Sequence, residues 1–230
     1  MDLDLDWERI EGELGERGYA TTGRVLTAAE CEALVGGYEQ ENAFRSTVVM
    51  ARHGFGRGEY KYYRYPLPEV IAELRQAFYP RLAKVANAWA ELLGREAEFP
   101  PDHSEYLKQC HSAGQMRPTP LILKYGVGDY NCLHQDLYGE MYFPMQVAFL
   151  LSEPGEEFSG GEFVLVEQRP RMQSRVEVVP LSLGEGVIFA VNQRPVRGSK
   201  GYYRVAMRHG VSRLRSGERY TLGVIFHDAT

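Results

Sequence analysis

Residues 123–137 read LKYGVGDYNCLHQDL, and residues 208–223 read RHGVSRLRSGERYTLG. Both stretches combine β-branched and aromatic residues with Gly and other turn-forming residues, the composition of short strands joined by tight turns. This pattern begins near residue 119 and continues through the second half of the chain. The predicted strands are 119–125, 143–151, 162–167, 175–179, 187–191, 204–212 and 219–226. Such a succession indicates a β-sandwich or jelly roll.

The residues before this β-rich part show helical periodicity instead. Apolar residues recur at helical spacing near the N-terminus, at Trp7, Ile10 and Leu14. Thr27 and Glu30 have the spacing of a capping box, which predicts a helix that begins there. A second capping-box pattern at 102–105 opens a short helix that Gly114 is expected to end.

The longest periodic stretch is the apolar stripe at 70–92, which begins after Pro68. Proline removes a helical hydrogen bond, so Pro80 is expected to kink or split this helix. We therefore predict an α+β protein with a mainly β core, a jelly roll backed by N-terminal helices. One domain is expected over 1–230, with a mostly helical supporting part at 1–118 and the jelly-roll catalytic core at 119–230.

Composition excludes several classes of protein. The chain of 230 residues is 44% hydrophobic and 25% charged, and it holds no apolar run of the roughly 18 residues that a membrane helix needs. Its acidic N-terminus lacks the pattern of a secretory signal, so a cytoplasmic protein without an obligate protein partner is expected. Cys31, Cys110 and Cys132 lie far apart, which favours reduced thiols over disulfides.

One short motif in the β-rich part carries metal-binding chemistry. His134 and Asp136 stand at i and i+2, so on an extended segment their side chains project from the same side. Two histidines and one carboxylate are the ligand set of non-haem Fe(II) oxygenases, because they leave metal positions open for a co-substrate and O2. His209 is the best candidate for the third ligand, since it lies in a predicted strand ten residues before Arg219.

An HxD motif, a distal His and an Arg ten residues later together resemble the 2-oxoglutarate/Fe(II) dioxygenases. The resemblance covers roughly 119–228 and implies a double-stranded β-helix, with Fe(II), 2-oxoglutarate and O2 as cofactor and co-substrates. The two quoted stretches are similar to a bacterial oxygenase subfamily thought to act on alkylated nucleic acid. Alkylated DNA or RNA is therefore the partner that the resemblance implies.

The same resemblance suggests how the co-substrate is held. In related enzymes an Arg-x-Ser/Thr pair grips the distal carboxylate of 2-oxoglutarate, and Arg219 with Thr221 fits that pattern. A guanidinium suits the role because its planar fork binds a carboxylate bidentately. Tyr125 matches a tyrosine that lines the co-substrate pocket in prolyl-hydroxylase-like members.

Substrate contacts are harder to assign. The candidates are Tyr130, Asn131, Gln146, Arg194 and Arg197. Two segments, 45–65 and 192–208, interleave aromatic and basic residues, which suits stacking on bases beside phosphate contacts but equally suits a solvated face. Gln146 is the polar exception in the apolar run 145–151, and a structural hydrogen bond explains it as well as a role in a pocket.

Several features leave alternatives open. Well-known alkylation-repair dioxygenases carry a second Arg six residues after the first, and here that position is Ile225. His227-Asp228 is another source of a carboxylate ligand, and Cys132 is expected to be a small buried residue rather than a nucleophile. A hydroxylase of prolyl residues, other protein side chains or small molecules therefore remains an alternative, as does a non-catalytic cupin-like binding module.

Overall fold

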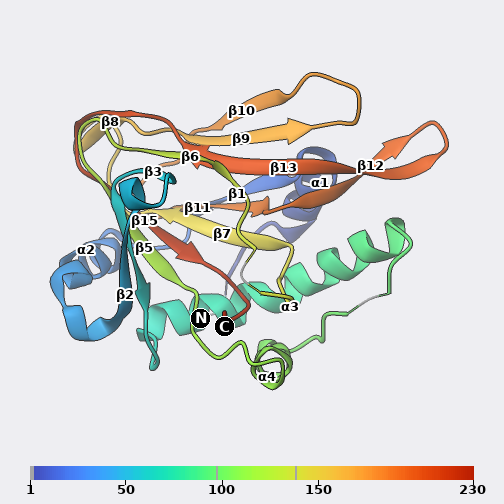
Figure 1. The fold of residues 1–230 in the computed structure, drawn as a ribbon, viewed down its shortest axis with the longest axis horizontal. Helices are drawn as coiled ribbons and strands as arrows, with labels where there is room; N and C mark the ends of the chain where they lie inside the picture. The colour runs from blue at the N-terminus through green and yellow to red at the C-terminus, as the bar shows by residue number, and fades with distance from the viewer. Residues whose placement is uncertain (1–2, 97, 138) are drawn as a thin grey trace.

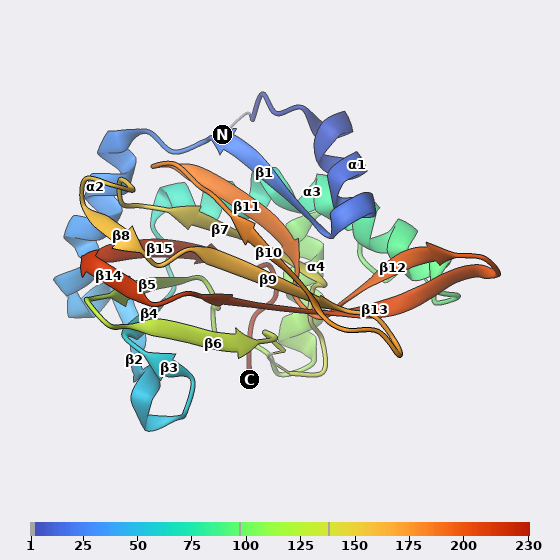
Figure 2. The same cartoon turned by 90° about the horizontal axis from the view of Figure 1, so that it is seen from above.

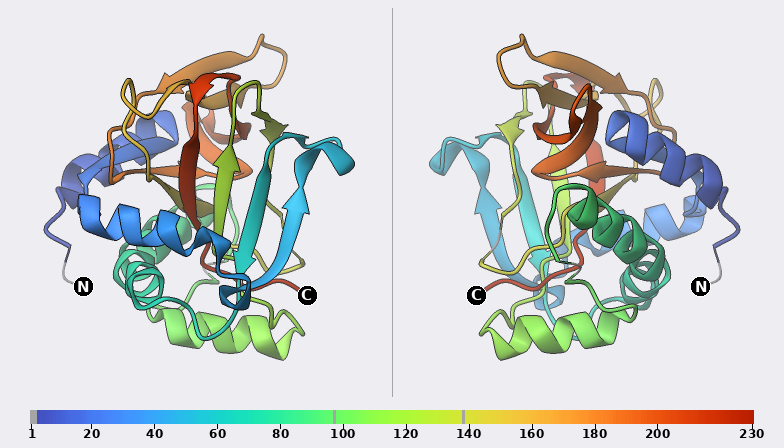
Figure 3. Two further views of the ribbon diagram at one scale, coloured as in Figure 1. Left: turned by 90° about the vertical axis from the view of Figure 1, so that its left-hand side faces the viewer. Right: turned by 90° about the vertical axis from the view of Figure 1, so that its right-hand side faces the viewer.

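The computed structural model describes residues 3–96, 98–137 and 139–230. The helices are α1 (Trp7–Arg17), α2 (Ala28–Gly36), α3 (Glu69–Leu92) and α4 (His103–Ser112), with short 3-10 turns η1 (Gly37–Glu39), η2 (Glu41–Ala43) and η3 (Met50–Arg52). The strands form two facing sheets, and α3 and α4 lie on the outer side of the larger one (Figures 1 and 3).

The larger sheet has the strand order β1-β11-β7-β15-β5-β4-β2. Its strands are β1 (Tyr19–Arg24), β11 (Glu185–Ala190), β7 (Met145–Leu150), β15 (Arg219–Val224), β5 (Leu121–Tyr125), β4 (Glu59–Tyr63) and β2 (Phe44–Val49). Neighbouring strands pair antiparallel. The sheet thus combines strands from both halves of the sequence.

The smaller sheet has the order β10-β9-β13-β6-β3, and β12 pairs with β13 as a hairpin that extends beyond the sheet (Figure 2). Its strands are β10 (Arg175–Val179), β9 (Phe163–Gln168), β13 (Gly201–Val211), β6 (Tyr130–His134), β3 (Gly56–Arg57) and β12 (Gln193–Gly198). A separate ribbon joins β8 (Phe158–Gly160) to β14 (Leu214–Gly217). The fold is a double-stranded β-helix, which confirms the predicted jelly roll with supporting helices.

Among the described residues, four strands lie in the part of the sequence predicted as mostly helix, and three of them belong to the larger sheet. β1 pairs with β11 at one edge of the larger sheet, and β4 and β2 extend the other edge beyond β5. The prediction for 1–118 was therefore wrong in these segments. β1 and β4 are stabilised in part by pairing with strands far away in the sequence, and β2 is an edge strand that pairs with β4.

The helices otherwise follow the sequence signals. The Thr27 and Glu30 side chains and backbones exchange the hydrogen bonds of a capping box. α4 begins after Asp102 as predicted, although the Asp102 side chain makes no capping bond. α3 runs without a break through Pro80, so the predicted split does not occur.

The strand β7 shows how the two layers share one sheet. All six of its residues are buried, as the apolar run predicted. Val147 and Phe149 pack with the helices in the main hydrophobic core, whereas Gln146 and Ala148 face the space between the sheets. Since successive side chains point to opposite faces, one face of β7 stabilises the fold and the other faces a cavity.

A buried polar cluster fixes the C-terminal segment after β15. Arg75 on α3 forms an ion pair with Asp228 at 3.0 Å, and the Tyr65 hydroxyl donates to the same carboxylate at 2.8 Å. His111 on α4 also contacts Asp228, at 2.8 Å. His227-Asp228 was considered as a source of a metal ligand, but its carboxylate is engaged in this cluster.

His103 and His227 belong to the same region and are both buried. The His103 Nε2 atom lies 2.8 Å from the Phe226 carbonyl, so it carries a proton and donates to that oxygen. Burial, reinforced by the charge of Arg75, lowers the pKa of His103 to about 3 and that of His227 to about 4. Both imidazoles are therefore neutral in the folded protein at pH 5.

None of the described helices has both the length and the hydropathy that a membrane span requires.

Acid is expected to destabilise the fold through these histidines. Below about pH 6.5 the unfolded chain protonates both imidazoles and the folded chain does not, so the free energy of unfolding falls as the pH falls. Each histidine contributes a slope of about 1.4 kcal/mol per pH unit until its folded pKa is reached. Urea denaturation at several pH values between 6 and 4 measures this effect. The free energy of unfolding of His103→Gln should fall less steeply than that of wild type, by about 1.4 kcal/mol per pH unit. Parallel curves for the two proteins would contradict the assignment.

Candidate metal centre and co-substrate pocket

The centre is built on the pairing of β6 with β13. His134 and His209 are direct partners in the antiparallel register. Along β13, Val205, Met207 and His209 are buried while the residues between them are more exposed, so His209 faces the interior between the sheets. Asp136 follows two residues after His134, just beyond the end of β6.

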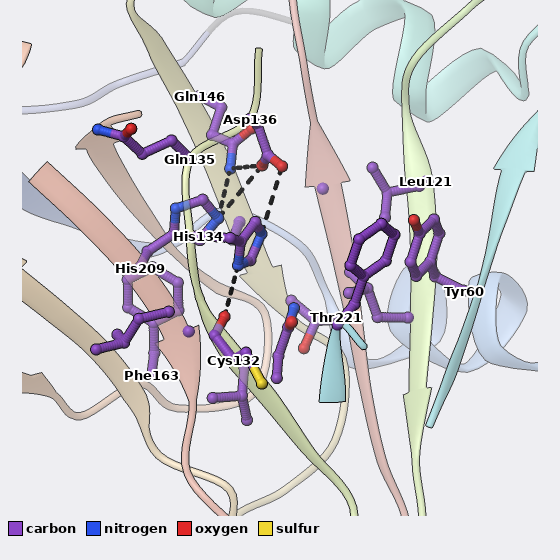
Figure 4. Close-up of a pocket in the computed structure, with 18 of the residues that line it drawn as sticks. Tyr60, Leu121, Cys132, His134, Gln135, Asp136, Gln146, Phe163, His209 and Thr221 are labelled. Atoms are coloured by element: carbon purple, nitrogen blue, oxygen red, sulfur yellow. Dashed lines mark hydrogen bonds and ion pairs between the residues drawn. The ribbon is translucent and has the colours of Figure 1, made fainter. Parts of the chain in front are cut away.

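The three side chains converge on one point. Asp136 Oδ1 lies 3.3 Å from His134 Nε2, and Asp136 Oδ2 lies 3.3 Å from His209 Nε2. One potential ligand atom from each residue lies within 4.8 Å of the others. Figure 4 shows both imidazoles and the carboxylate turned toward one another. The structure therefore brings together the three residues that the sequence predicted as iron ligands.

Neighbouring groups fix the orientation of these side chains. His134 Nδ1 lies 2.8 Å from the Cys132 carbonyl oxygen, which only accepts, so Nδ1 carries the proton and Nε2 faces the centre with its lone pair. The Gln146 amide donates to Asp136 Oδ2 at 2.9 Å. Such contacts orient metal ligands and are part of the affinity of a site.

The electrostatics of the three residues fit a divalent cation. Burial opposes the charge of Asp136, but His209 and His134 outweigh it and hold the pKa of Asp136 well below its usual range. Burial and the charge of His134 lower the pKa of His209. The pKa of His134 is raised overall. Burial alone would lower this pKa, but the interaction with Asp136 outweighs the effect of burial. One carboxylate and two imidazoles therefore lie together, and their charges are coupled. Such a donor set suits Fe(II).

A cavity of about 340 Å³ opens beside this centre, between the two sheets. The larger sheet lines it with alternate residues of three neighbouring strands: Tyr60 of β4, Leu121, Leu123 and Tyr125 of β5, and Arg219 and Thr221 of β15. His134, Asp136, Gln146 and His209 line the same cavity. The metal candidates and the co-substrate candidates therefore share one enclosed space.

Arg219 places a buried positive charge in the cavity. Its side chain is 2% exposed, and Nη1 donates to the Thr221 hydroxyl at 2.5 Å. Burial lowers the pKa of Arg219 to about 10, which still leaves it charged at neutral pH. Within the described residues, no carboxylate forms an ion pair with it, and its Nε atom is buried without a hydrogen-bond partner. An anion such as the distal carboxylate of 2-oxoglutarate fits this position.

Tyr125 and Asn131 complete this part of the cavity. The Tyr125 side chain is fully buried, and its ring lies 5.7 Å from the Arg219 guanidinium carbon. The Asn131 amide approaches the Tyr125 hydroxyl at 3.4 Å. The predicted position of Tyr125 in the co-substrate pocket thus agrees with the geometry, and its role there remains a prediction.

The remaining substrate candidates do not gather at the cavity. Arg194 is 1% exposed and forms a buried ion pair with Glu167, so it cannot reach a substrate as predicted. Arg197 is exposed on the β12–β13 hairpin, which extends beyond the two sheets (Figure 1), and it does not line the cavity. Tyr130 does not line the cavity and packs instead beneath the Arg213 guanidinium at 4.9 Å. Both arginines were predicted to contact substrate. The sequence does not reveal that Arg194 is buried or that Arg197 lies away from the cavity lining.

Several lining residues were missed or misjudged. Tyr60 lies in a strand that was not predicted, and the alternation EYKYY at 59–63 was the signal for it. Cys132 was expected to be buried, but it is exposed and lines the cavity beside His134. Ile225 is buried and also lines the cavity, so the position of the absent second arginine is an apolar wall.

Comparison with known proteins identifies relatives of this chain at the level of sequence. Residues 58–229 match the family Oxygenase-NA, described as an oxygenase catalysing oxidative methylation of damaged DNA. Two uncharacterised proteins of Mycobacterium tuberculosis, from strains CDC 1551 and H37Rv, are each 54% identical over 164 residues. These residues cover 71% of this chain and 70% of each relative.

Comparison with solved structures identifies a shared fold. A Pseudomonas putida prolyl-4-hydroxylase is similar with a TM-score of 0.58 and 15% identity, covering 97% of this chain and 99% of that one. A Burkholderia pseudomallei oxidoreductase of the 2OG-Fe(II) oxygenase family is similar with a TM-score of 0.56 and 17% identity, covering 100% and 95%. At such identities the likeness concerns the fold alone.

The metal assignment predicts a loss of binding in His209→Ala. Removing one of three ligands should weaken Fe(II) or Co(II) affinity by more than the roughly 10–100-fold typical of changes around the ligands. Anaerobic titration with Co(II), followed by its visible absorption bands, measures this. His111→Gln is the matched control, because that imidazole lies in the C-terminal polar cluster. Unchanged metal affinity in His209→Ala would remove His209 from the centre.

The anchor role of Arg219 predicts a different kinetic effect. Arg219→Ala should raise the KM for 2-oxoglutarate by about 30-fold or more, because a buried contact between charges is worth about 2–5 kcal/mol. Co(II) affinity should remain, and Arg219→Lys should restore the KM only partly. Succinate formation at varied 2-oxoglutarate gives the KM, and a value equal to wild type in Arg219→Ala would rule out the anchor.

Proposed function

The chain belongs to the Oxygenase-NA family and is a 2-oxoglutarate/Fe(II)-dependent oxygenase, and from this premise we propose that it demethylates alkylated bases in DNA or RNA by oxidation. The observation that carries the proposal is the shared cavity. His134, Asp136 and His209 meet at one part of it, and the buried charge of Arg219 lies in the same space. A keto acid held at both ends fits this arrangement.

The residues of this cavity have separate tasks in the proposed reaction. Bound Fe(II), 2-oxoglutarate and O2 supply the oxidant that converts a C–H bond into C–OH, with succinate and CO2 as the other products. Arg219 and Thr221 orient the keto acid through its distal carboxylate. Gln146 holds one oxygen of Asp136, which leaves the other oxygen directed at His134.

An N-methyl group gives this oxidation its repair outcome. Hydroxylation turns N–CH3 into N–CH2OH, and that product breaks its C–N bond to give the N–H base and formaldehyde. The apolar side chains of Leu121, Leu123 and Ile225 line the cavity and keep competing water away from the reacting carbon. A base inside a duplex cannot enter such a cavity, so the substrate is single-stranded or flipped out of its stack.

Damaged nucleic acid is favoured as substrate by the description of the family, which names damaged DNA. A hydroxylase of prolyl residues or other side chains is the alternative, supported by the likeness to prolyl-4-hydroxylases in fold only. The cupin-like binding module does not account for membership of an oxygenase family. A cytoplasmic location is part of this proposal, because the proposed substrate is nucleic acid.

The proposed reaction predicts release of formaldehyde from methylated single-stranded DNA or RNA. Iron-loaded enzyme with 2-oxoglutarate should form equal amounts of succinate and formaldehyde, and mass spectrometry should show oligonucleotides lighter by one methylene group. The control is the same lesion panel with His209→Ala. If the wild type turns over 2-oxoglutarate without altering any lesion but hydroxylates a peptide or metabolite, the nucleic-acid proposal is wrong.

A further inference from the structure

The loop 50–58, sequence MARHGFGRG, lies beside the mouth of the cavity and contains η3 and β3. It links β2 to β4 and projects from the sheets next to β6 (Figure 2). Gly54 and Phe55 line the same cavity as the metal candidates. The loop is therefore a part of the molecule that a substrate meets on entering.

Backbone contacts hold this loop in one position. Met50 is fully buried, its N–H donates to the Gly58 carbonyl at 3.0 Å, and the Phe55 N–H returns to the Met50 carbonyl at 3.2 Å. The Cys132 N–H donates to the Phe55 carbonyl at 2.9 Å. Because Cys132 precedes His134 by two residues on β6, one strand sets the place of both Phe55 and the metal centre.

Gly56 makes this close approach to β6 possible. Its φ of 130° lies in a region that side chains rarely adopt, and a Cβ there would stand 2.3 Å from the Tyr130 carbonyl oxygen. Gly56 and Arg57 pair with Asn131 and Tyr130 of β6. The loop thus acts as an added strand that carries an aromatic side chain to the cavity mouth.

The side chains on this fixed loop are unusually open to solvent. Phe55 is 48% exposed, and the exposed His53 ring stacks on it at 5.3 Å with an interplanar angle of 23°. Leu133 and Leu137, each 45% exposed, line the cavity from the side of the metal ligands. Large apolar side chains kept exposed around a cavity mark a binding surface.

The charged side chains of the loop itself are positive. Arg52 and Arg57 are exposed, and residues 50–58 include no acidic side chain. Arg57 pairs in register with Tyr130, whose ring carries the Arg213 guanidinium at 4.9 Å. Aromatic faces interleaved with cations are the recognition surface of single-stranded nucleic acid, because bases stack on the rings while phosphates contact the cations.

We propose that Phe55, backed by His53, is a stacking platform for the base that flanks the alkylated base, with Arg52 and Arg57 contacting the neighbouring phosphates. The alkylated base itself enters the cavity toward the metal centre, while its neighbour stays at the mouth on the exposed ring. This inference rests on the proposed nucleic-acid substrate and names the residues that select for it.

Phe55→Ala tests the platform directly. Its affinity for a methylated single-stranded oligonucleotide, measured by fluorescence anisotropy with enzyme loaded with Mn(II) and 2-oxoglutarate, should fall by about fivefold or more. Phe55→Trp should restore it. Tyr202→Ala, which removes an exposed ring from the β12–β13 hairpin, is the control and should bind like wild type. Turnover of 2-oxoglutarate without nucleic acid should be equal in wild type and Tyr202→Ala, so that a difference in binding between them would not reflect damage to the metal centre.

Two further measurements separate stacking from charge. An oligonucleotide with an abasic site beside the methylated base should bind wild type and Phe55→Ala equally, because the stacking partner is gone. Phe55→Ala should keep the salt dependence of wild type, whereas Arg57→Gln should reduce the slope of log affinity against log salt by about one.

The outcomes distinguish this inference from the proposed function. If wild type demethylates the oligonucleotide and Phe55→Ala binds and reacts as well as wild type, the platform is overturned and the function stands. If wild type binds no nucleic acid and instead hydroxylates a peptide, both proposals are overturned. Loss of binding in Phe55→Ala that persists with the abasic oligonucleotide would also overturn the platform, since the effect would not depend on a stacked base.

Discussion

The pairing of His134 with His209 across β6 and β13 is the constraint on which the rest of the site depends. A slip of one residue in either strand would turn an imidazole out of the cavity, because side chains alternate between faces. Gly210 shows how closely the strands approach after this pair, since a Cβ there would lie 2.7 Å from the Asn131 carbonyl oxygen. The irregular register that follows His209 lets Asn131 turn toward Tyr125. One strand pair thus places both a proposed metal ligand and a residue of the proposed co-substrate pocket.

The two sheets divide stability from chemistry. The face of the larger sheet toward α3 and α4 carries apolar packing and the cluster around Asp228, and both of these stabilise the fold. Its other face carries Gln146, Thr221 and Arg219, and these point at space rather than at a packed layer. Because the apolar face secures the strands, the opposite face can keep buried polar atoms such as Gln146 Oε1 without a hydrogen-bond partner in the described structure.

The candidate site residues could be predicted from the sequence because they follow short, regular spacings along the chain. His134, Asp136, His209 and Arg219 could be grouped because HxD and the ten-residue step to an arginine are local patterns, and a strand brings such positions to one face. β1 escaped prediction because its stability comes from pairing with β11, far away in the sequence, whereas the alternation at 59–63 was a local signal for β4 that was not used. Arg194 escaped for a related reason, since only the fold reveals that Glu167 meets it in the interior. Phe55 reached the cavity through a backbone bond to Cys132 that no pattern at 45–65 encoded.

If Arg219 anchors 2-oxoglutarate as proposed, its buried guanidinium couples the stability of the folded chain to the co-substrate. The buried charge of Arg219 is contacted by the Thr221 hydroxyl and by the rings of Tyr125 and Phe158. Its Nε atom has no hydrogen-bond partner within the described residues, which leaves part of the desolvation cost in the folded state. A ligand that binds the folded chain alone stabilises it by RT ln(1 + [L]/Kd), or about 2.7 kcal/mol at a concentration 100 times Kd. A cell depleted of 2-oxoglutarate would then hold less of the folded enzyme as well as less of its co-substrate. Through the proposed contact with Arg219, the co-substrate would stabilise the same enzyme that consumes it.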